Sequence, residues 1–247
     1  ERLFGKIDNE NPPLTTLYYD FEMTDKQFYT RYTNERGDFY NFPENLYIDN
    51  PDILSLAENS KSFMETLFQR FRYEIEKLDA KVVFIDNITY LNDNTMQEGQ
   101  TATEVMKKLK QLKDECDISI CVIAHTPKMN ITSPITVNNL GGSKMISNFS
   151  DSISCLGASK KGSNVRYFKQ VKPSRSGEWV YDSQNVIELT LQKHDTILRM
   201  RHEGFTAEME HIGITEGDLY KGKRIDAIEL RKMGKSIRTI AAELGVS

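Results

Sequence analysis

The sequence has few cysteines, a single tryptophan and no long apolar segment. Its 247 residues include three cysteines, Cys116, Cys121 and Cys155, without C-x-x-C spacing. An odd number of scattered thiols argues against a disulfide framework and favours reduced cysteines in a cytoplasmic protein. No run of about 18 apolar residues occurs, so we expect neither a transmembrane helix nor a membrane partner.

A phosphate-binding motif is also missing. The pattern G-x-x-x-x-G-K-[ST] occurs nowhere in the sequence, and the Gly-Lys-Ser at 234–236 has Glu229 where the first glycine should stand. The net charge of −4 argues against a protein that coats DNA uniformly. This net charge is compatible with a local basic patch.

Apolar strands alternate with amphipathic helices in the first half of the chain. The apolar spacing predicts helices at 24–32, 60–78 and 101–115 and strands at 14–21, 81–86 and 118–124. Thr24 and Gln27 have the spacing of a capping box at the start of the first helix. Continuous apolar strands separated by helices predict an α/β fold with a doubly wound, mainly parallel sheet and right-handed crossovers.

The pattern changes near residue 145. We expect a short helix at 145–149, followed by strands of alternating apolar and polar residues at 151–156, 165–171, 178–181, 185–192 and 196–202. These strands predict an antiparallel extension of the sheet. The core domain would then span residues 1–205, with a linker at 206–217.

Residues 218–247 are predicted to form a small all-α unit. Helices at 222–233 and 236–244, with Gly234 and Ser236 at the turn between them, resemble the front half of a helix-turn-helix. From residue 221 onward there are seven Lys or Arg residues and three acids. This local positive charge is consistent with DNA binding, for which Lys235 and Arg238 are candidates.

Polar side chains stand at the ends of three predicted strands. Asp86 and Asn87 follow the strand at 81–86, Glu22 ends the strand before it, and His125 ends the strand after it. The C-terminal edge of a parallel sheet is where α/β folds bind ligands, and an Asp there can hold the water shell of Mg²⁺. Glu22 could orient an attacking water, and His125 could sense a γ-phosphate.

Each of these residues also has an alternative role that needs no ligand. Asp86 could cap the following loop, Glu22 could favour the start of the next helix through its dipole, and His125 could bond to backbone at the strand end. Asp20 is a second candidate acid. We expect strand alternation to place the Asp20 side chain on the other face, which favours Glu22 as the base.

Two further segments could bind phosphate or DNA. Lys169, Lys172 and Arg175 lie near a predicted hairpin end, where fixed cations could stabilise a transferring phosphate in the same subunit or its neighbour; a solvated charged face is the alternative. The glycine-rich segment ending in Lys144 could present N–H groups to phosphate or contact DNA. It is equally compatible with an ordinary flexible loop.

The order of four motifs resembles the RecA-like P-loop ATPase superfamily. The motifs are Tyr-Tyr-Asp-Phe-Glu-Met at 18–23, Val-Val-Phe-Ile-Asp-Asn at 82–87, Val-Ile-Ala-His-Thr-Pro-Lys at 122–128 and Gly-Gly-Ser-Lys-x-x-x-Asn-Phe-x-Asp at 141–151. The branch that the sequence is similar to holds the RepA-type and DnaB-type hexameric helicases. Within that branch it looks closest to mobile-element ATPases of Bacteroides-type bacteria that end in a helix-turn-helix.

This resemblance implies ATP and Mg²⁺ as cofactors, DNA as a partner and a homo-oligomer, for which a hexamer is one form. It implies Glu22 as the catalytic base, Asp86 as the Walker B acid and His125 as the polar strand-end residue. A Lys-x-Arg pair of the family acts on the neighbouring subunit's nucleotide; Lys172 and Arg175 are one residue further apart than that spacing. The family's phosphate loop precedes the first of these motifs, so we expect it upstream of Glu1; the alternative is a protein that has lost the loop and with it ATP hydrolysis.

The expected function is therefore that of an ATP-hydrolysing motor or switch in replication or mobilisation of a plasmid or mobile element. A RepA-like helicase is one form of it. The alternative is a DNA-binding regulator or scaffold whose ATPase-like domain is nucleotide-gated or inactive.

Overall fold

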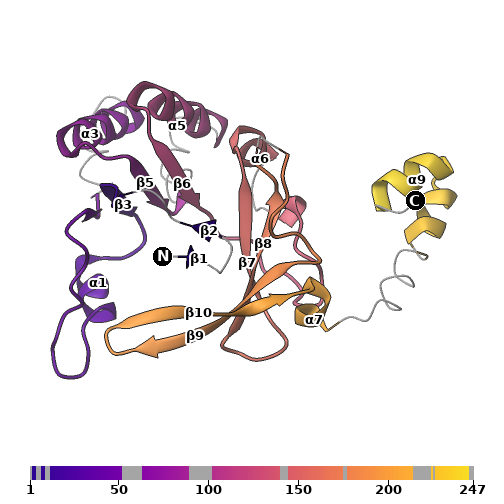
Figure 1. Ribbon diagram of the computed structural model, residues 1–247. Coiled ribbons are helices and arrows are strands. Elements are labelled where there is room, and N and C mark those ends of the chain that lie inside the picture. Colours follow the sequence, from indigo (N-terminus) through magenta and orange to yellow (C-terminus); the bar gives the residue numbers. More distant parts are fainter. Residues whose placement is uncertain are drawn as a thin grey trace.

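Two four-stranded sheets, one parallel and one antiparallel, form the framework of the structure (Figure 1). The computed structural model describes residues 2–3, 7–8, 12–51, 63–88, 102–139, 144–174, 177–213, 224 and 226–244. A small hairpin of β1 (Arg2–Leu3) and β2 (Ile7–Asp8) precedes the sheets. Among the described helices, none combines the length and the apolar character that crossing a bilayer requires.

The parallel sheet has the strand order β4-β3-β5-β6. Its strands are β3 (Thr16–Asp20), β4 (Leu46–Asp49), β5 (Val82–Asp86) and β6 (Ser119–Ile123). The register pairs Asp20 with Asp86 and Asp86 with Ile123, so that β3, β5 and β6 end side by side. The parallel arrangement predicted from the apolar runs is confirmed.

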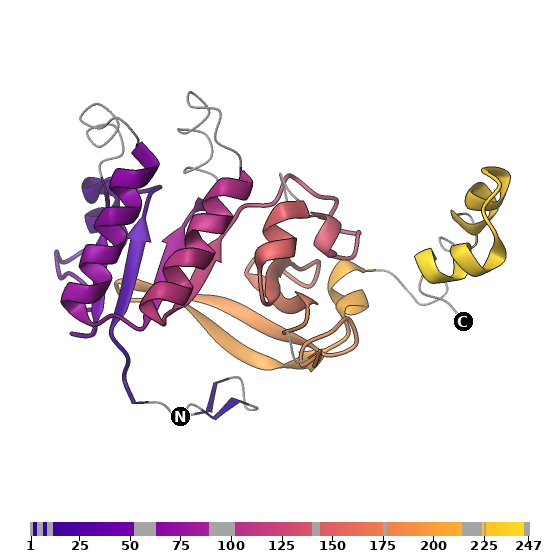
Figure 2. The same cartoon turned by 90° about the horizontal axis from the view of Figure 1, so that it is seen from above.

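Two amphipathic helices cover one face of this sheet. The helices α3 (Phe63–Leu78) and α5 (Ala102–Cys116) lie next to each other over the strands (Figure 2). Their apolar side chains form one buried cluster with the inward residues of the strands, which include Leu17, Tyr19 and Ile85. Burying a large apolar side chain contributes about 1.5–3 kcal/mol, so this cluster is the main stabilising feature of the sheet.

The helix α1 (Asp25–Arg31) begins with the predicted capping box but does not add a second helical layer. Gln27 N donates to Thr24 Oγ1 at 3.3 Å, and Thr24 N donates to Gln27 Oε1 at 2.8 Å. None of the residues of α1 is buried. In the described part of the chain, helices therefore pack against one face of the parallel sheet, whereas a doubly wound sheet has helices on both.

The antiparallel strands form a sheet of their own rather than the predicted extension. The strands β7 (Ile153–Ala158), β8 (Val165–Lys172), β9 (Val186–His194) and β10 (Ile197–Thr206) follow the order β10-β9-β8-β7. Between β6 and β7 the chain includes the 3-10 turn η2 (Val137–Asn139) and the helix α6 (Lys144–Phe149). This long connection carries β7 away from the parallel sheet instead of returning it to the edge as a hairpin would.

The strand predicted at 178–181 is wrong, and a side chain explains why. Val180 N and Tyr181 N both donate to Gln170 Oε1, at 2.7 and 3.0 Å. Gln170 N in turn donates to Tyr181 O at 2.7 Å. The amide of one glutamine thus satisfies two backbone donors that a strand would have paired with a neighbouring strand.

The first half of the predicted linker belongs to the fold. A register shift between His202 and Gly204 lets β10 continue to Thr206, beyond the predicted strand end. The helix α7 (Glu208–Ile212) then packs into the structure, and His211 and Ile212 are fully buried. The Gly204 irregularity interrupts the alternation, which is why the sequence pattern predicted an earlier end.

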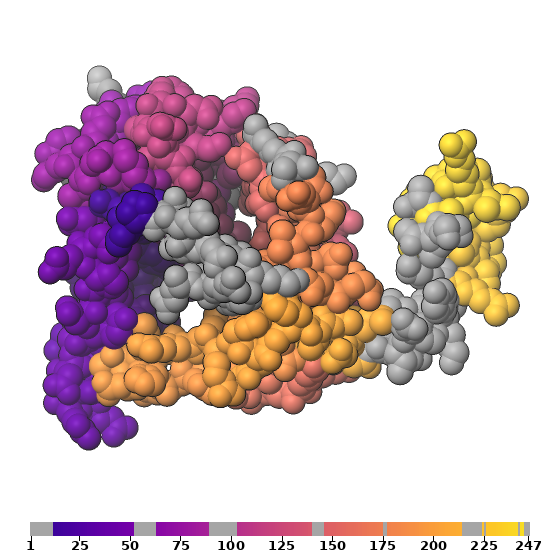
Figure 3. Space-filling view, viewed as in Figure 1, coloured from indigo at the N-terminus to yellow at the C-terminus, as the bar shows by residue number. Residues whose placement is uncertain are grey.

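The β9–β10 hairpin reaches across the molecule to the N-terminal half. Figure 3 shows it as an orange ribbon of atoms that runs to the violet segment around α1. At its turn, Asp195 Oδ1 accepts a hydrogen bond of 2.9 Å from Asn34 Nδ2. This contact ties the tip of the hairpin to the loop that follows α1.

Two helices are present near the C-terminus. Residues 226–232 are helical, and α9 (Ile237–Leu244) follows a turn in which Gly234 has a φ of 84°. Glycine adopts this left-handed conformation without the steric cost that a side chain brings. Ser236 Oγ accepts from Thr239 N at 3.1 Å and caps α9.

The close packing of the antiparallel sheet predicts a stability defect for Gly157→Ala. An added Cβ would lie 2.4 Å from Tyr167 Cζ and 2.8 Å from Ile135 Cδ1. Because the Tyr167 ring is rigid and buried, we expect a loss of about 1–3 kcal/mol in the free energy of unfolding, measured by urea denaturation. Gly162→Ala, whose nearest contacts would be 3.3 Å, is the control. Equal stability of the two variants would contradict this packing.

Candidate functional site

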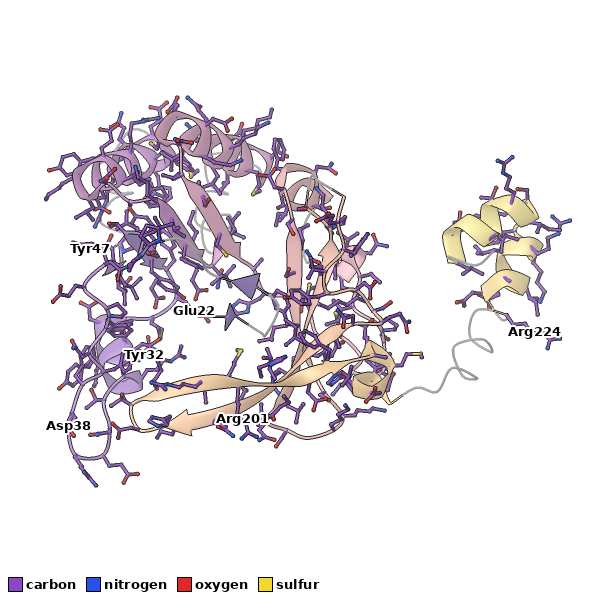
Figure 4. All side chains as sticks on the ribbon, in the orientation of Figure 1. Glu22, Tyr32, Asp38, Tyr47, Arg201 and Arg224 are labelled. Atoms are coloured by element: carbon purple, nitrogen blue, oxygen red, sulfur yellow. The ribbon has the colours of Figure 1, made fainter. Side chains whose placement is uncertain are left out.

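The C-terminal ends of β3, β5 and β6 bring three of the predicted residues together. Asn87 Nδ2 donates to Glu22 Oε2 at 3.2 Å, and His125 Nε2 lies 3.2 Å from the same oxygen. Each residue follows a different strand, and Figure 4 places Glu22 on the inner side of the parallel sheet. The structure therefore gathers side chains that are separated by up to 103 positions in the sequence.

The backbone at the end of β3 directs Glu22 to this position. Phe21 N donates to Asp86 O at 2.6 Å, which is the last ladder bond between the two strands. Asp20 Oδ1 then accepts from Glu22 N at 3.0 Å and from Met23 N at 2.9 Å, so the chain turns immediately. Residues two apart on a strand share a face, so alternation does not separate Asp20 from Glu22 as expected from the sequence; this turn does.

The carboxyl group of Glu22 is accessible to water and readily ionised. Its side chain is 53% exposed, and that of His125 is 64% exposed. The hydrogen bond with His125 lowers the pKa of Glu22 below its ordinary value; burial opposes this effect, and the bond from Asn87 adds to it. The ionised carboxylate can accept a hydrogen bond from water, as a general base must.

Asp86 is held by a residue that the strand-end pattern did not indicate. The hydroxyl of Tyr18 donates to Asp86 Oδ2 across the two strands. Burial, together with this bond, raises the pKa of Tyr18 far above its usual range, so the hydroxyl keeps its proton and stays a donor. Tyr18 also stacks on Phe84, with ring centroids 5.9 Å apart. The cross-strand register sets this pairing, and no motif in the sequence carries it.

The donor groups at this edge suit a hard cation with a water shell. Asp86 supplies a carboxylate, and the Oδ2 of the neighbouring Asp20 is buried without a hydrogen-bond partner in the described part of the chain. The described residues contain no cluster of three or more potential metal ligands. One or two carboxylates are what Mg²⁺ uses when phosphates and water complete its coordination. These carboxylates therefore fit Mg²⁺ if other groups complete its coordination.

Two of the predicted phosphate-binding cations have protein partners. Lys169 is 8% exposed, and its Nζ donates to Glu208 Oε2 at 2.6 Å and to Ile135 O at 2.8 Å. Lys172 Nζ donates to Ser147 O and Ser150 O, each at 2.6 Å. These bonds hold Lys169 in a buried ion pair and Lys172 at the C-terminal end of α6.

The remaining candidates are dispersed. Arg175 lies outside the described residues, and Lys144 is described only as the first residue of α6. In the C-terminal helices, Lys235 Nζ donates to both carboxylate oxygens of Glu243, at 2.8 and 2.7 Å. Arg238 is exposed on α9. The structure thus brings the predicted acids and His125 together at one edge, whereas the candidate cations that it describes lie on other elements.

Comparison with known proteins gives a family match over the first half of the chain. A family model described as an AAA domain matches residues 1–130. No curated protein sequence matches the chain. Matches to solved structures comprise 147 chains, and one is a KaiC-like protein from the hyperthermophilic archaeon Pyrococcus horikoshii. It has 11% sequence identity and a TM-score of 0.49, and the alignment covers 76% of each chain.

The contact between Glu22 and His125 predicts a measurable change in acidity. In a His125→Ala variant the pKa of Glu22 should rise towards its ordinary value, because the main interaction that stabilises the carboxylate is lost. The pKa is read from the carboxyl carbon shift in a ¹³C NMR titration. His194→Ala, at the exposed end of β9, is the matched control. An unchanged Glu22 pKa in His125→Ala would contradict this geometry.

Proposed function

The chain belongs to the AAA domain family and so contains a nucleotide-binding ATPase domain of the P-loop superfamily, and we propose that it is an ATP-hydrolysing motor or switch acting on DNA. Its process would be replication or mobilisation of a plasmid or mobile element, and a RepA-like helicase is one form of the proposal. The observation that supports hydrolysis is the meeting of Glu22, Asn87 and His125 beside Asp86 at the sheet edge.

In this proposal each residue has a separate task. Asp86, anchored by Tyr18, would hold the water shell of the Mg²⁺ that accompanies ATP, and the ion would supply charge that neutralises phosphate. Glu22 orients the attacking water. Among the described residues, Asn87 and His125 both contact Glu22 Oε2, so Oε1 would accept the hydrogen bond from that water.

His125 would report the state of the nucleotide. Its ring now contacts Glu22, and a γ-phosphate at the same edge would offer a competing acceptor of higher charge. Exchange of His125 between these two partners would move the segment that follows β6. Residue Ile135 at the far end of that segment is bonded through both its N–H and its C=O.

The cations would act after a change of partners or from another subunit. Lys169 and Lys172 would have to leave their present acceptors before reaching a phosphate. The proposed homo-oligomer, with a hexamer as one form, would bring Lys172 and Arg175 of one copy towards the nucleotide of the next. Such cations stabilise the charge that develops on the transferred phosphate.

We assign DNA binding to the C-terminal helices and to Lys144. The ATPase core would extend through residue 213, because α7 packs on it, and residues 226–244 would form part of a helix-turn-helix. Lys235 and Arg238 are the proposed phosphate contacts. The same two helices, with Ser236 capping α9, favour the second candidate function: a DNA-binding regulator or scaffold whose ATPase-like domain is nucleotide-gated or inactive.

Replacing Glu22 by Gln tests the proposed hydrolysis. In the full-length protein, the Glu22→Gln variant should lower ATP turnover by about 100- to 10,000-fold, because the amide cannot accept the proton of water. Binding of a fluorescent ATP analogue should persist. Glu35→Gln, an exposed acid in the loop after α1, is the matched control. Unchanged turnover in Glu22→Gln would refute the role of Glu22.

DNA added to the same assay separates the two candidate functions. Hydrolysis that rises with DNA, or separation of duplex strands, favours the motor. Binding to a specific DNA sequence without hydrolysis by the wild-type protein favours the regulator.

A further inference from the structure

Asp20 is a buried carboxylate that the proposed chemistry does not use. It is the last residue of β3, it is 2% exposed, and it lies opposite Asp86 in the parallel register. Its Oδ1 accepts two backbone bonds, from Glu22 N at 3.0 Å and Met23 N at 2.9 Å. Its Oδ2 is buried and has no hydrogen-bond partner among the described residues.

The two bonds to Oδ1 turn the chain directly after β3, at Glu22 and Met23. A side-chain oxygen that accepts from the N–H groups two and three residues ahead replaces the backbone acceptor of a turn. Without this turn, Glu22 would extend β3 and present its side chain on the same face as Asp20. With it, the Glu22 carboxylate comes within 3.2 Å of both Asn87 Nδ2 and His125 Nε2.

Asp20 cannot substitute for Glu22 in the present arrangement. One of its oxygens is occupied by backbone donors, and the whole side chain is shielded from solvent. Glu22, in contrast, has a side chain that is 53% exposed. The contribution of Asp20 to the site therefore passes through the backbone of Glu22 and Met23.

We propose that Asp20 is a positioning residue, whose Oδ1 aims Glu22 at Asn87 and His125 through geometry and not through charge. The inference rests on the proposed function only where it concerns turnover, since Glu22 is there the base. Both backbone bonds go to Oδ1, so the position of this acceptor is the property of Asp20 that the turn requires.

Two substitutions separate acceptor position from charge in the full-length protein. Asp20→Asn keeps an oxygen at the Oδ1 position and removes the charge. Asp20→Glu keeps the charge and displaces the oxygens by one methylene group. Circular dichroism checks that both variants fold; if Asp20→Glu does not, Asp20→Ala, which removes the acceptor, takes its place.

Two readouts are measured for each variant. The first is ATP turnover, as kcat and KM. The second is the imidazole NMR signal of His125, which reports its contact with Glu22 and needs no hydrolysis. The chain has four histidines, so single substitutions suffice to assign this signal.

We expect Asp20→Asn to keep the turnover of the wild type and Asp20→Glu to lose it. Asp20→Asn should retain kcat within about threefold and leave the His125 signal in place, because its side-chain oxygen still accepts the two backbone bonds that position Glu22. A misplacement of the base by about 1 Å would instead lower kcat on the order of 100-fold. Asp20→Glu should lose on the order of 100-fold in kcat with KM within about twofold, since the base is misplaced while nucleotide contacts remain. Its His125 signal should move to the position seen in Glu22→Gln.

Any other pattern overturns the inference. Activity retained by Asp20→Glu and lost by Asp20→Asn would show that charge is the required property, as for a cation ligand. Loss in both variants would show that the acceptor position alone is not sufficient, and retention in both would show that Asp20 is dispensable. If the wild-type protein does not hydrolyse ATP, the proposed function fails, while the His125 signal still decides the role of Asp20.

Discussion

Parallel pairing of β3 with β5 and of β5 with β6 is the constraint on which the candidate site depends. Parallel strands end at the same edge, so the residues that follow Asp20, Asp86 and Ile123 meet in space. The apolar side chains under α3 and α5 fix this register, because a shift by one residue would turn them towards the opposite face. The register of the parallel strands therefore determines both the packing of the core and the position of Glu22.

A second set of interactions stabilises the other end of the segment that begins at His125. Glu208 on α7 accepts from Ile135 N at 2.8 Å and from Lys169 Nζ at 2.6 Å, and the Tyr167 hydroxyl lies 3.3 Å from it. Removing one partner of a buried ion pair typically costs about 3–5 kcal/mol, because the remaining charge stays buried. The segment 125–135 thus connects the strand-end site to a rigid anchor on α7, which directly precedes the C-terminal part of the chain.

The sequence predicted those features that depend on local pattern. Apolar runs predicted β5 and β6, Thr24 and Gln27 predicted the start of α1, and strand-end logic predicted that Glu22 and His125 would meet. The prediction was wrong where a side chain distant in the sequence determines the local structure. Gln170 satisfies the backbone near Tyr181, and Glu208 neutralises Lys169 from 39 positions away, so that a buried cation looked like a surface charge. The roles of Tyr18 and Asp20 likewise follow from register and from a turn, neither of which has a sequence motif.

A structure of the full-length protein with Mg²⁺ and a non-hydrolysable ATP analogue would decide whether the edge formed by Glu22, Asp86 and His125 binds the nucleotide. We expect Mg²⁺ next to Asp86, the γ-phosphate within hydrogen-bonding distance of His125, and the Glu22 carboxylate facing the γ-phosphorus with room for one water. A nucleotide bound at another part of the molecule, with Glu22 and Asp86 away from its phosphates, would contradict it.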